Sequence, residues 1–144
     1  MTERKKTQHF KELCEKIGLA MMMGQKLQFA LAYYYAVFHI VNSRWSKEKA
    51  KKRIEYYLSS PMDVIVNSIE KDAPLDNELF QEIVRFKEKM DWLTHEFNQE
   101  STLPLIQGKG FEIYIKIMEK IIKHATRIIE KLNEVDKKLK PLRR

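Results

Sequence analysis

The residues best suited to chemistry in this sequence lie in one stretch, between positions 85 and 95. On a continuous helix, Arg85, Trp92 and His95 fall at three- and four-residue steps through Glu88 and share one face. A histidine can transfer a proton and an arginine can stabilise an anionic oxygen, so this face suits phosphodiester chemistry or RNA binding. Asp91, one turn before His95, could hold the imidazole in one tautomer. The alternative is an ordinary solvated helix face on which Trp92 is half buried.

The other histidines do not form a metal-binding pattern. His9, His39 and His124 are widely separated, and the sequence has neither a histidine pair four residues apart nor a Glu-x-x-His spacing. We therefore expect no metal and no cofactor. His39 lies in an apolar stretch and is expected to be a hydrogen-bonded core residue, whereas His9 and His124 are expected at the surface.

Positive charge is concentrated in two segments of a chain whose net charge is +7. Residues 44–53 carry six positive charges and one negative, and the segment from residue 131 onward carries six positive and two negative. Residues 70–100 hold nine acidic side chains against four basic ones. An electropositive surface attracts phosphate backbones, although acidic and basic helices that face each other or solvate the bundle fit the same totals. The residues expected to bind nucleic acid are Arg44, Lys47, Lys51, Lys52 and Arg53.

Apolar residues spaced three and four apart predict that helices carry these side chains. Four glycines and four prolines are too few turn residues for a many-stranded β fold. A length of 144 residues fits one domain. We expect an all-α, single-domain bundle of about five helices, residues 1–144, with two long antiparallel helices. The expected helices run from about Thr7 to Val41, from Ser46 to about Ser59, from Ser60 to before Ala73, from Asp76 to about Phe97 and from Phe111 to about Leu139, with a loop over residues 100–110 and a basic, frayed tail at residues 137–144.

The stretch Trp92-Leu93-Thr94-His95-Glu96-Phe97 resembles the motif of the HEPN superfamily of helical bundles. That motif has an arginine, four to six residues, then a histidine, often with an aromatic residue two positions later. The expected order of elements is also similar, with a long apolar helix, short helices, a motif-bearing helix and a long final helix. In that family the arginine and histidine of two protomers commonly meet at a dimer interface and form a metal-independent ribonuclease site.

This sequence departs from the motif on the amino-terminal side of His95. Where the family has its arginine, the chain has Glu-Lys-Met, with Lys89 in the middle, and Asp91 stands where asparagine is common. Arg85 lies ten residues before His95, about 15 Å along a helix axis, so it could meet only the His95 of a second copy. The resemblance implies that His95 is the acid or base. Lys89 or Arg85 would then stabilise the anion, and Asp91 would orient the imidazole.

Two classes of function remain open. The resemblance implies a HEPN-like protein of toxin or defence type, either a metal-independent ribonuclease or an inactive relative that binds RNA. The alternative is a non-enzymatic module, such as an antitoxin, immunity or regulatory protein, whose separated charges bind a protein partner. If His95 pairs with Arg85 or Lys89 of a second chain in an open cleft, the first class is favoured. If His95 points alone into solvent, the second is favoured.

The first long helix is apolar on nearly all sides between Leu19 and Val41. We expect a second copy of the chain to cover part of it in a homodimer. Gln28 and His39 interrupt this apolar stretch, so we do not expect it to span a membrane, and lipid binding is the least favoured role. The single cysteine, Cys14, and the lack of a signal-peptide pattern at the start predict a cytoplasmic location.

Overall fold

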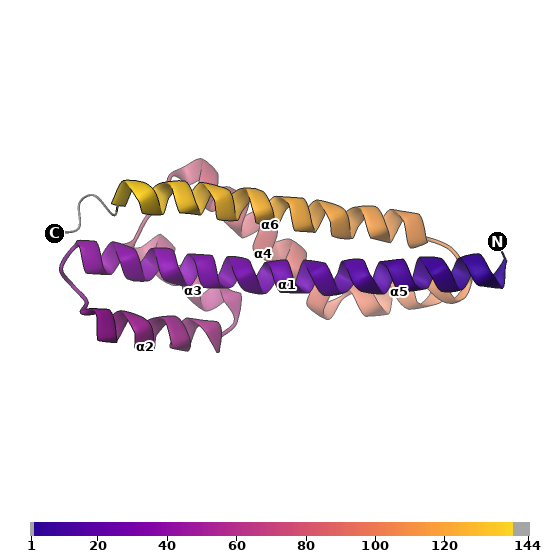
Figure 1. Cartoon of the computed structure of the whole chain (residues 1–144). Coiled ribbons are helices and arrows are strands. Elements are labelled where there is room, and N and C mark those ends of the chain that lie inside the picture. The colour runs from indigo at the N-terminus through magenta and orange to yellow at the C-terminus, as the bar shows by residue number, and fades with distance from the viewer. Residues whose placement is uncertain (1, 140–144) are drawn as a thin grey trace.

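Six α-helices and no β-strand occur within residues 2–139, the residues that the computed structural model describes (Figure 1). The all-α prediction is therefore confirmed for these residues, with six helices in place of about five. No helix in this range has both the length and the apolar content that crossing a membrane requires. The helices are α1 (Glu3–Val41), α2 (Lys47–Leu58), α3 (Met62–Asp72), α4 (Asn77–His95), α5 (Phe97–Ile106) and α6 (Phe111–Leu139).

Short polar side chains begin three of the helices. Thr2, Ser46 and Asp76 each accept a hydrogen bond from the backbone N–H three residues later, at 3.2, 3.1 and 3.3 Å. The first N–H groups of a helix have no partner inside it, so these contacts stabilise the start of α1, α2 and α4. Because Thr2 caps α1, that helix begins at Glu3, four residues before the predicted Thr7.

The two long helices, α1 and α6, run parallel to each other, which corrects the predicted antiparallel arrangement. His9 of α1 lies beside Phe111 at the start of α6, with ring centroids 6.0 Å apart. Further along both helices, Lys16 Nζ is 3.6 Å from Glu119 Oε2. Residue numbers thus rise together along the pair. The reason is that α2 to α5 carry the chain back to the amino-terminal end of α1, where α6 begins (Figure 1).

The predicted loop at residues 100–110 is mostly helix. α5 occupies Phe97–Ile106 and is anchored by two buried residues, Phe97 and Ser101. Pro104 lacks a backbone N–H, so α5 loses one internal hydrogen bond there, and the helix ends two residues later. The turn into α6 follows at Gly108 and Gly110, whose φ values of 74° and 87° suit glycine. All three residues lie in the stretch predicted as a loop, but Pro104 is within α5 and only the two glycines form the turn after it.

The core lies between α1, α4 and α6. Leu27 and Leu31 of α1 and Phe86 of α4 are fully buried, and the Tyr34 hydroxyl donates a 2.8 Å hydrogen bond to the Ala73 carbonyl. The predicted apolar spacing places Leu27 and Leu31 on one face of α1 and Phe86 on one face of α4, and these faces are buried. α4 runs antiparallel to α6, because its Glu82 meets Lys131 and its Lys89 meets His124.

Helix α2 packs on α1 on the side away from α6 (Figure 1). The Gln28 amide donates hydrogen bonds to the carbonyls of Tyr57 and Ser60 at 2.7 and 2.6 Å, which fixes the turn after α2. His39 is buried as predicted, stacks on Trp45 at 4.4 Å, and has Nε2 3.5 Å from an Asp72 carboxylate oxygen. Neither of its ring nitrogens makes the predicted hydrogen bond within the described residues. The contacts of Gln28 and Trp45 hold the two ends of α2 against α1, and the contact with Asp72 joins α1 to the end of α3.

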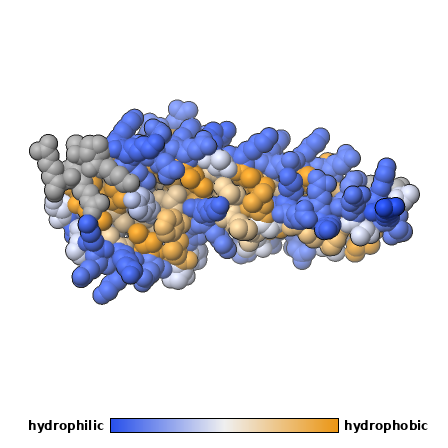
Figure 2. Space-filling view, viewed as in Figure 1, coloured by the Kyte–Doolittle hydropathy of each residue, from blue (hydrophilic) through white to orange (hydrophobic). Residues whose placement is uncertain are grey.

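Part of α1 stays exposed despite the cover from α2, α3, α4 and α6. Met22 and Phe29 have 55% and 49% of their surface exposed, and Cys14 is exposed as well. Figure 2 shows hydrophobic residues between the hydrophilic rows over α2 and α6. At the other end of the chain, residues 137–139 of the predicted frayed tail continue α6, and residues 140–144 lie outside the described residues.

Candidate functional site

The predicted catalytic residues lie on two different sides of α4. His95, the last residue of α4, is exposed and lines a groove of about 350 Å³ with α1 and α3. Within residues 2–139, the side chain of His95 makes no hydrogen bond or ion pair. Its pairing with Arg85 or Lys89 of a second chain, which would favour a ribonuclease, stays a prediction. Asp91 lines the same groove, but its carboxylate is 3.4 Å from Lys87 Nζ. Asp91 is therefore paired with Lys87 and does not hold the His95 imidazole as predicted.

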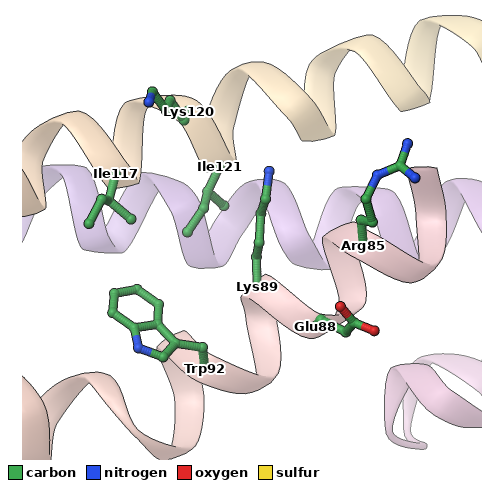
Figure 3. Close-up of a pocket in the computed structure, with 7 residues that line it drawn as sticks. All are labelled: Arg85, Glu88, Lys89, Trp92, Ile117, Lys120 and Ile121. Carbon is green, nitrogen blue, oxygen red and sulfur yellow. The ribbon is translucent and has the colours of Figure 1, made fainter. Parts of the chain in front are cut away.

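Arg85 and Lys89 line a second cleft, between α4 and α6 (Figure 3). This cleft has a volume of about 410 Å³, and within one chain it does not include His95. Figure 3 shows the Lys89 side chain extending from α4 toward α6, beside Ile121. The residues that line the cleft are Arg85, Glu88, Lys89, Trp92, Ile117, Lys120 and Ile121.

Positive charge in the α4–α6 cleft is not balanced by carboxylates. Arg85, Lys89 and Lys120 line it, and within residues 2–139 none of them forms an ion pair with an acidic side chain. Glu88 is the one acidic lining residue. Partial burial lowers the pKa of Lys89, and the positive charges of Arg127, Arg85 and Lys120 lower it further. The cleft therefore has an excess of positive charge that a bound anion would relieve.

His124 of α6 lies beside this cleft and is buried, so the prediction that it lies at the surface is wrong. Only 6% of its surface is exposed, and its ring meets the edge of Phe86 at 5.7 Å. Burial, together with the charges of Lys89 and Arg127, lowers its pKa to about 4. The ring is therefore neutral at pH 7, and its Nδ1 accepts a 3.1 Å hydrogen bond from Lys89 Nζ. The spacing to the buried Ile121 and Ile128, three and four residues away, was the signal that could have placed it in the core.

Beyond His124, α4 and α6 are joined by a cluster of ion pairs. Glu82 of α4 is buried and accepts a 2.9 Å hydrogen bond from Lys131, and Arg127 lies 3.3 Å from its other oxygen. The hydrogen bond from Lys131 holds the pKa of Glu82 below its usual value. Glu82 thus forms ion pairs with Arg127 and Lys131, and its single negative charge offsets one of their two positive charges.

Trp92 forms a fixed aromatic wall of the cleft. Its indole Nε1 donates a 2.7 Å hydrogen bond to Glu100 of α5, and its ring meets Phe97 with centroids 5.4 Å apart. Figure 3 shows the ring extending from α4 toward Ile117 of α6. A half-buried ring held at its edge and by a hydrogen bond loses little freedom when a ligand stacks on it.

The five basic residues predicted to bind nucleic acid are exposed, and none of them forms an ion pair within the described range. They belong to α2 and the turn before it: Arg44, Lys47, Lys51, Lys52 and Arg53. Arg53 and Lys49 lie over the Trp45 ring at 5.8 and 5.7 Å. This basic α2 surface is separate from the α4–α6 cleft, because α2 packs on the far side of α1 (Figure 1).

The chain matches no family model, no curated protein and no solved structure. The resemblance to HEPN proteins therefore stays a prediction. In the part of the chain that the structure describes, no group of three His, Cys, Asp or Glu side chains is placed to hold a metal ion.

Proposed function

We propose that this protein binds RNA, and that the α4–α6 cleft is a phosphate-binding part of its surface. The observation that supports this proposal is the set of three lining cations, Arg85, Lys89 and Lys120, that lack an acidic partner within residues 2–139. Glu88 is the one acidic residue that lines the cleft, so the three cations repel one another, and phosphate groups would remove that repulsion. The exposed basic residues of α2 would add contacts to the RNA backbone. The toxin or defence setting and the cytoplasmic location stay predictions from the sequence.

Binding, not cleavage, is the activity that we propose for the single chain. A phosphodiester cleavage site needs its acid or base and its anion stabiliser on the same phosphate. Here His95 is exposed in one groove, whereas Arg85 and Lys89 line another. Cleavage would require a second copy to bring its Arg85 or Lys89 to this His95.

An RNA-binding assay at several salt concentrations tests the proposal. Each phosphate contact with a single strand changes log K by about −0.7 for each unit of log salt concentration. Contacts from Arg85, Lys89 and Lys120 alone therefore predict a slope near −2, and contacts from α2 would make it steeper. No binding of an unstructured RNA oligonucleotide at low salt, or binding that is indifferent to salt, would contradict the proposal.

Incubation with the same RNA in EDTA separates binding from cleavage. We expect the RNA to stay intact with the wild-type chain and with His95→Ala. RNA that is cut by the wild type and left intact by His95→Ala would show that His95 is catalytic, and the binding-only proposal would be wrong.

A second copy of the chain is the partner that we propose for the exposed surface of α1. Phe29 and Tyr33 stack at 6.4 Å and line two grooves, one against α2 and one against α6. In a dimer with a two-fold axis, Phe29 and Tyr33 of each copy would lie in a groove of the other copy, so both copies use the same surface. This supports the homodimer expected from the sequence, and a different protein partner remains the alternative outcome.

A further inference from the structure

Cationic side chains and apolar or aromatic side chains together line the α4–α6 cleft. Arg85, Lys89 and Lys120 can contact a phosphate, but Ile117, Ile121 and Trp92 cannot (Figure 3). Its volume of about 410 Å³ lies within the range of sites that hold one small ligand group, roughly 300–1,000 Å³. The cleft therefore suits a ligand that carries negative charge beside a flat, apolar ring.

A nucleotide has this combination, but only when its base is unpaired and unstacked. In a duplex the base faces are covered by neighbouring base pairs, and a side chain reaches mainly the phosphates and the groove edges. In a single strand the base can turn out and stack on an aromatic ring. The Trp92 ring is already held by Glu100 and Phe97, so it offers a rigid surface for such a base.

We propose that the cleft binds a single-stranded nucleic-acid segment, with one unpaired base stacked on Trp92 and the adjoining phosphates held by Arg85, Lys89 and Lys120. This inference rests on the proposed RNA-binding function and specifies the form of the ligand. RNA and DNA strands share the chemistry that it uses, so both belong in the test. A bound phosphate would also favour the charged form of Lys89 and raise its pKa toward the ordinary value.

The fluorescence of Trp92 reports stacking directly in a Trp45→Phe background, where Trp92 is the one remaining tryptophan. The variant is titrated with an unstructured RNA oligonucleotide, a DNA strand of the same sequence, the RNA duplex and an abasic ribose-phosphate oligomer, while anisotropy measures binding. We expect the RNA and DNA strands to bind and to quench Trp92. The duplex and the abasic oligomer should bind more weakly and without quenching.

Trp92→Leu provides a second readout, because leucine keeps the apolar contact with Phe97 and removes the stacking surface. Its affinity for the single strand should fall by about 5- to 150-fold, the range of one base–aromatic stack. Its affinity for the abasic oligomer should stay near that of the wild type. Should Trp92→Leu fail to fold by circular dichroism, the quenching experiment still decides, since it leaves Trp92 in place.

The outcomes separate this inference from the proposed function. Salt-dependent RNA binding without quenching of Trp92, or equal binding of duplex and single strand, would overturn the inference and leave RNA binding intact. Binding and quenching by the DNA strand alone would support the inference and overturn the RNA function. No binding of any oligonucleotide at low salt would overturn both.

Discussion

Acidification should destabilise this protein through His124, and replacing that residue should remove the effect. The folded chain holds this imidazole neutral, with a pKa of about 4, whereas in the unfolded chain it titrates near 6.5. As the pH falls through 6.5, the unfolded state binds a proton that the folded state does not, so the free energy of unfolding falls. The contribution is fully present above pH 6.5 and is lost progressively down to about pH 4.

The size of the effect follows from the same two pKa values. Each pH unit within that window costs about 1.4 kcal/mol. By pH 4.5 the loss attributable to His124 should therefore be about 2–3 kcal/mol. Glu82 and His39 also have lowered pKa values and add to the total loss, so a comparison of two proteins is needed to isolate His124.

Urea denaturation of the wild type and of His124→Gln between pH 7.5 and pH 4.5 makes that comparison. Glutamine can accept a hydrogen bond from Lys89 and does not titrate. We expect the free energy of unfolding to fall by about 2–3 kcal/mol more in the wild type than in His124→Gln over this range. Parallel losses in the two proteins would refute the burial of His124 beside Lys89 and Arg127.

Three further predictions concern the bundle. Leu31→Ala should lower the free energy of unfolding in urea by about 3–5 kcal/mol, because Leu31 is fully buried; a loss below 1 kcal/mol, as expected for the exposed Leu19→Ala, would place Leu31 outside the core. Ser46→Ala should cost about 1 kcal/mol in the same assay by removing the cap of α2, and an unchanged value would mean that the cap is replaced by water. Sedimentation should give twice the 17.3 kDa chain mass for the wild type and the chain mass for Phe29→Glu; a monomeric wild type would contradict the dimer.

Local signals predicted the helices well. Ser46 and Asp76 have short side chains that reach the free N–H groups of the following turn, and each begins a helix as expected. The apolar spacing also placed Leu27, Leu31 and Phe86 in the core. These features depend on residues within a few positions of each other, so a single sequence contains the information they need.

Long-range features could not be predicted in the same way. The direction of α6 depends on how α2 to α5 return the chain to the start of α1. α5 lies in the stretch predicted as a loop, where Pro104 is an unfavourable residue for a helix. The spacing placed Arg85, Trp92 and His95 on one face, but it could not say where α1 and α6 would pack. Their positions divide that face into a groove at His95 and a cleft at Arg85. His124 was predicted at the surface, although it lies three and four residues from the buried Ile121 and Ile128, because a polar imidazole is buried only where a partner such as Lys89 reaches it.

The most direct test of the central claim compares two triple variants that lose the same charge. Arg85→Gln, Lys89→Gln and Lys120→Gln together remove the cations of the α4–α6 cleft. The matched control, Arg4→Gln, Lys5→Gln and Lys11→Gln, removes one arginine and two lysines from the exposed start of α1. We expect the affinity of the cleft variant for single-stranded RNA to fall at least about tenfold. Its slope of log K against log salt concentration should become shallower by about 2, whereas both quantities should change little in the control. Equal losses in both variants would show that RNA responds only to net charge, and the cleft would not be its binding site.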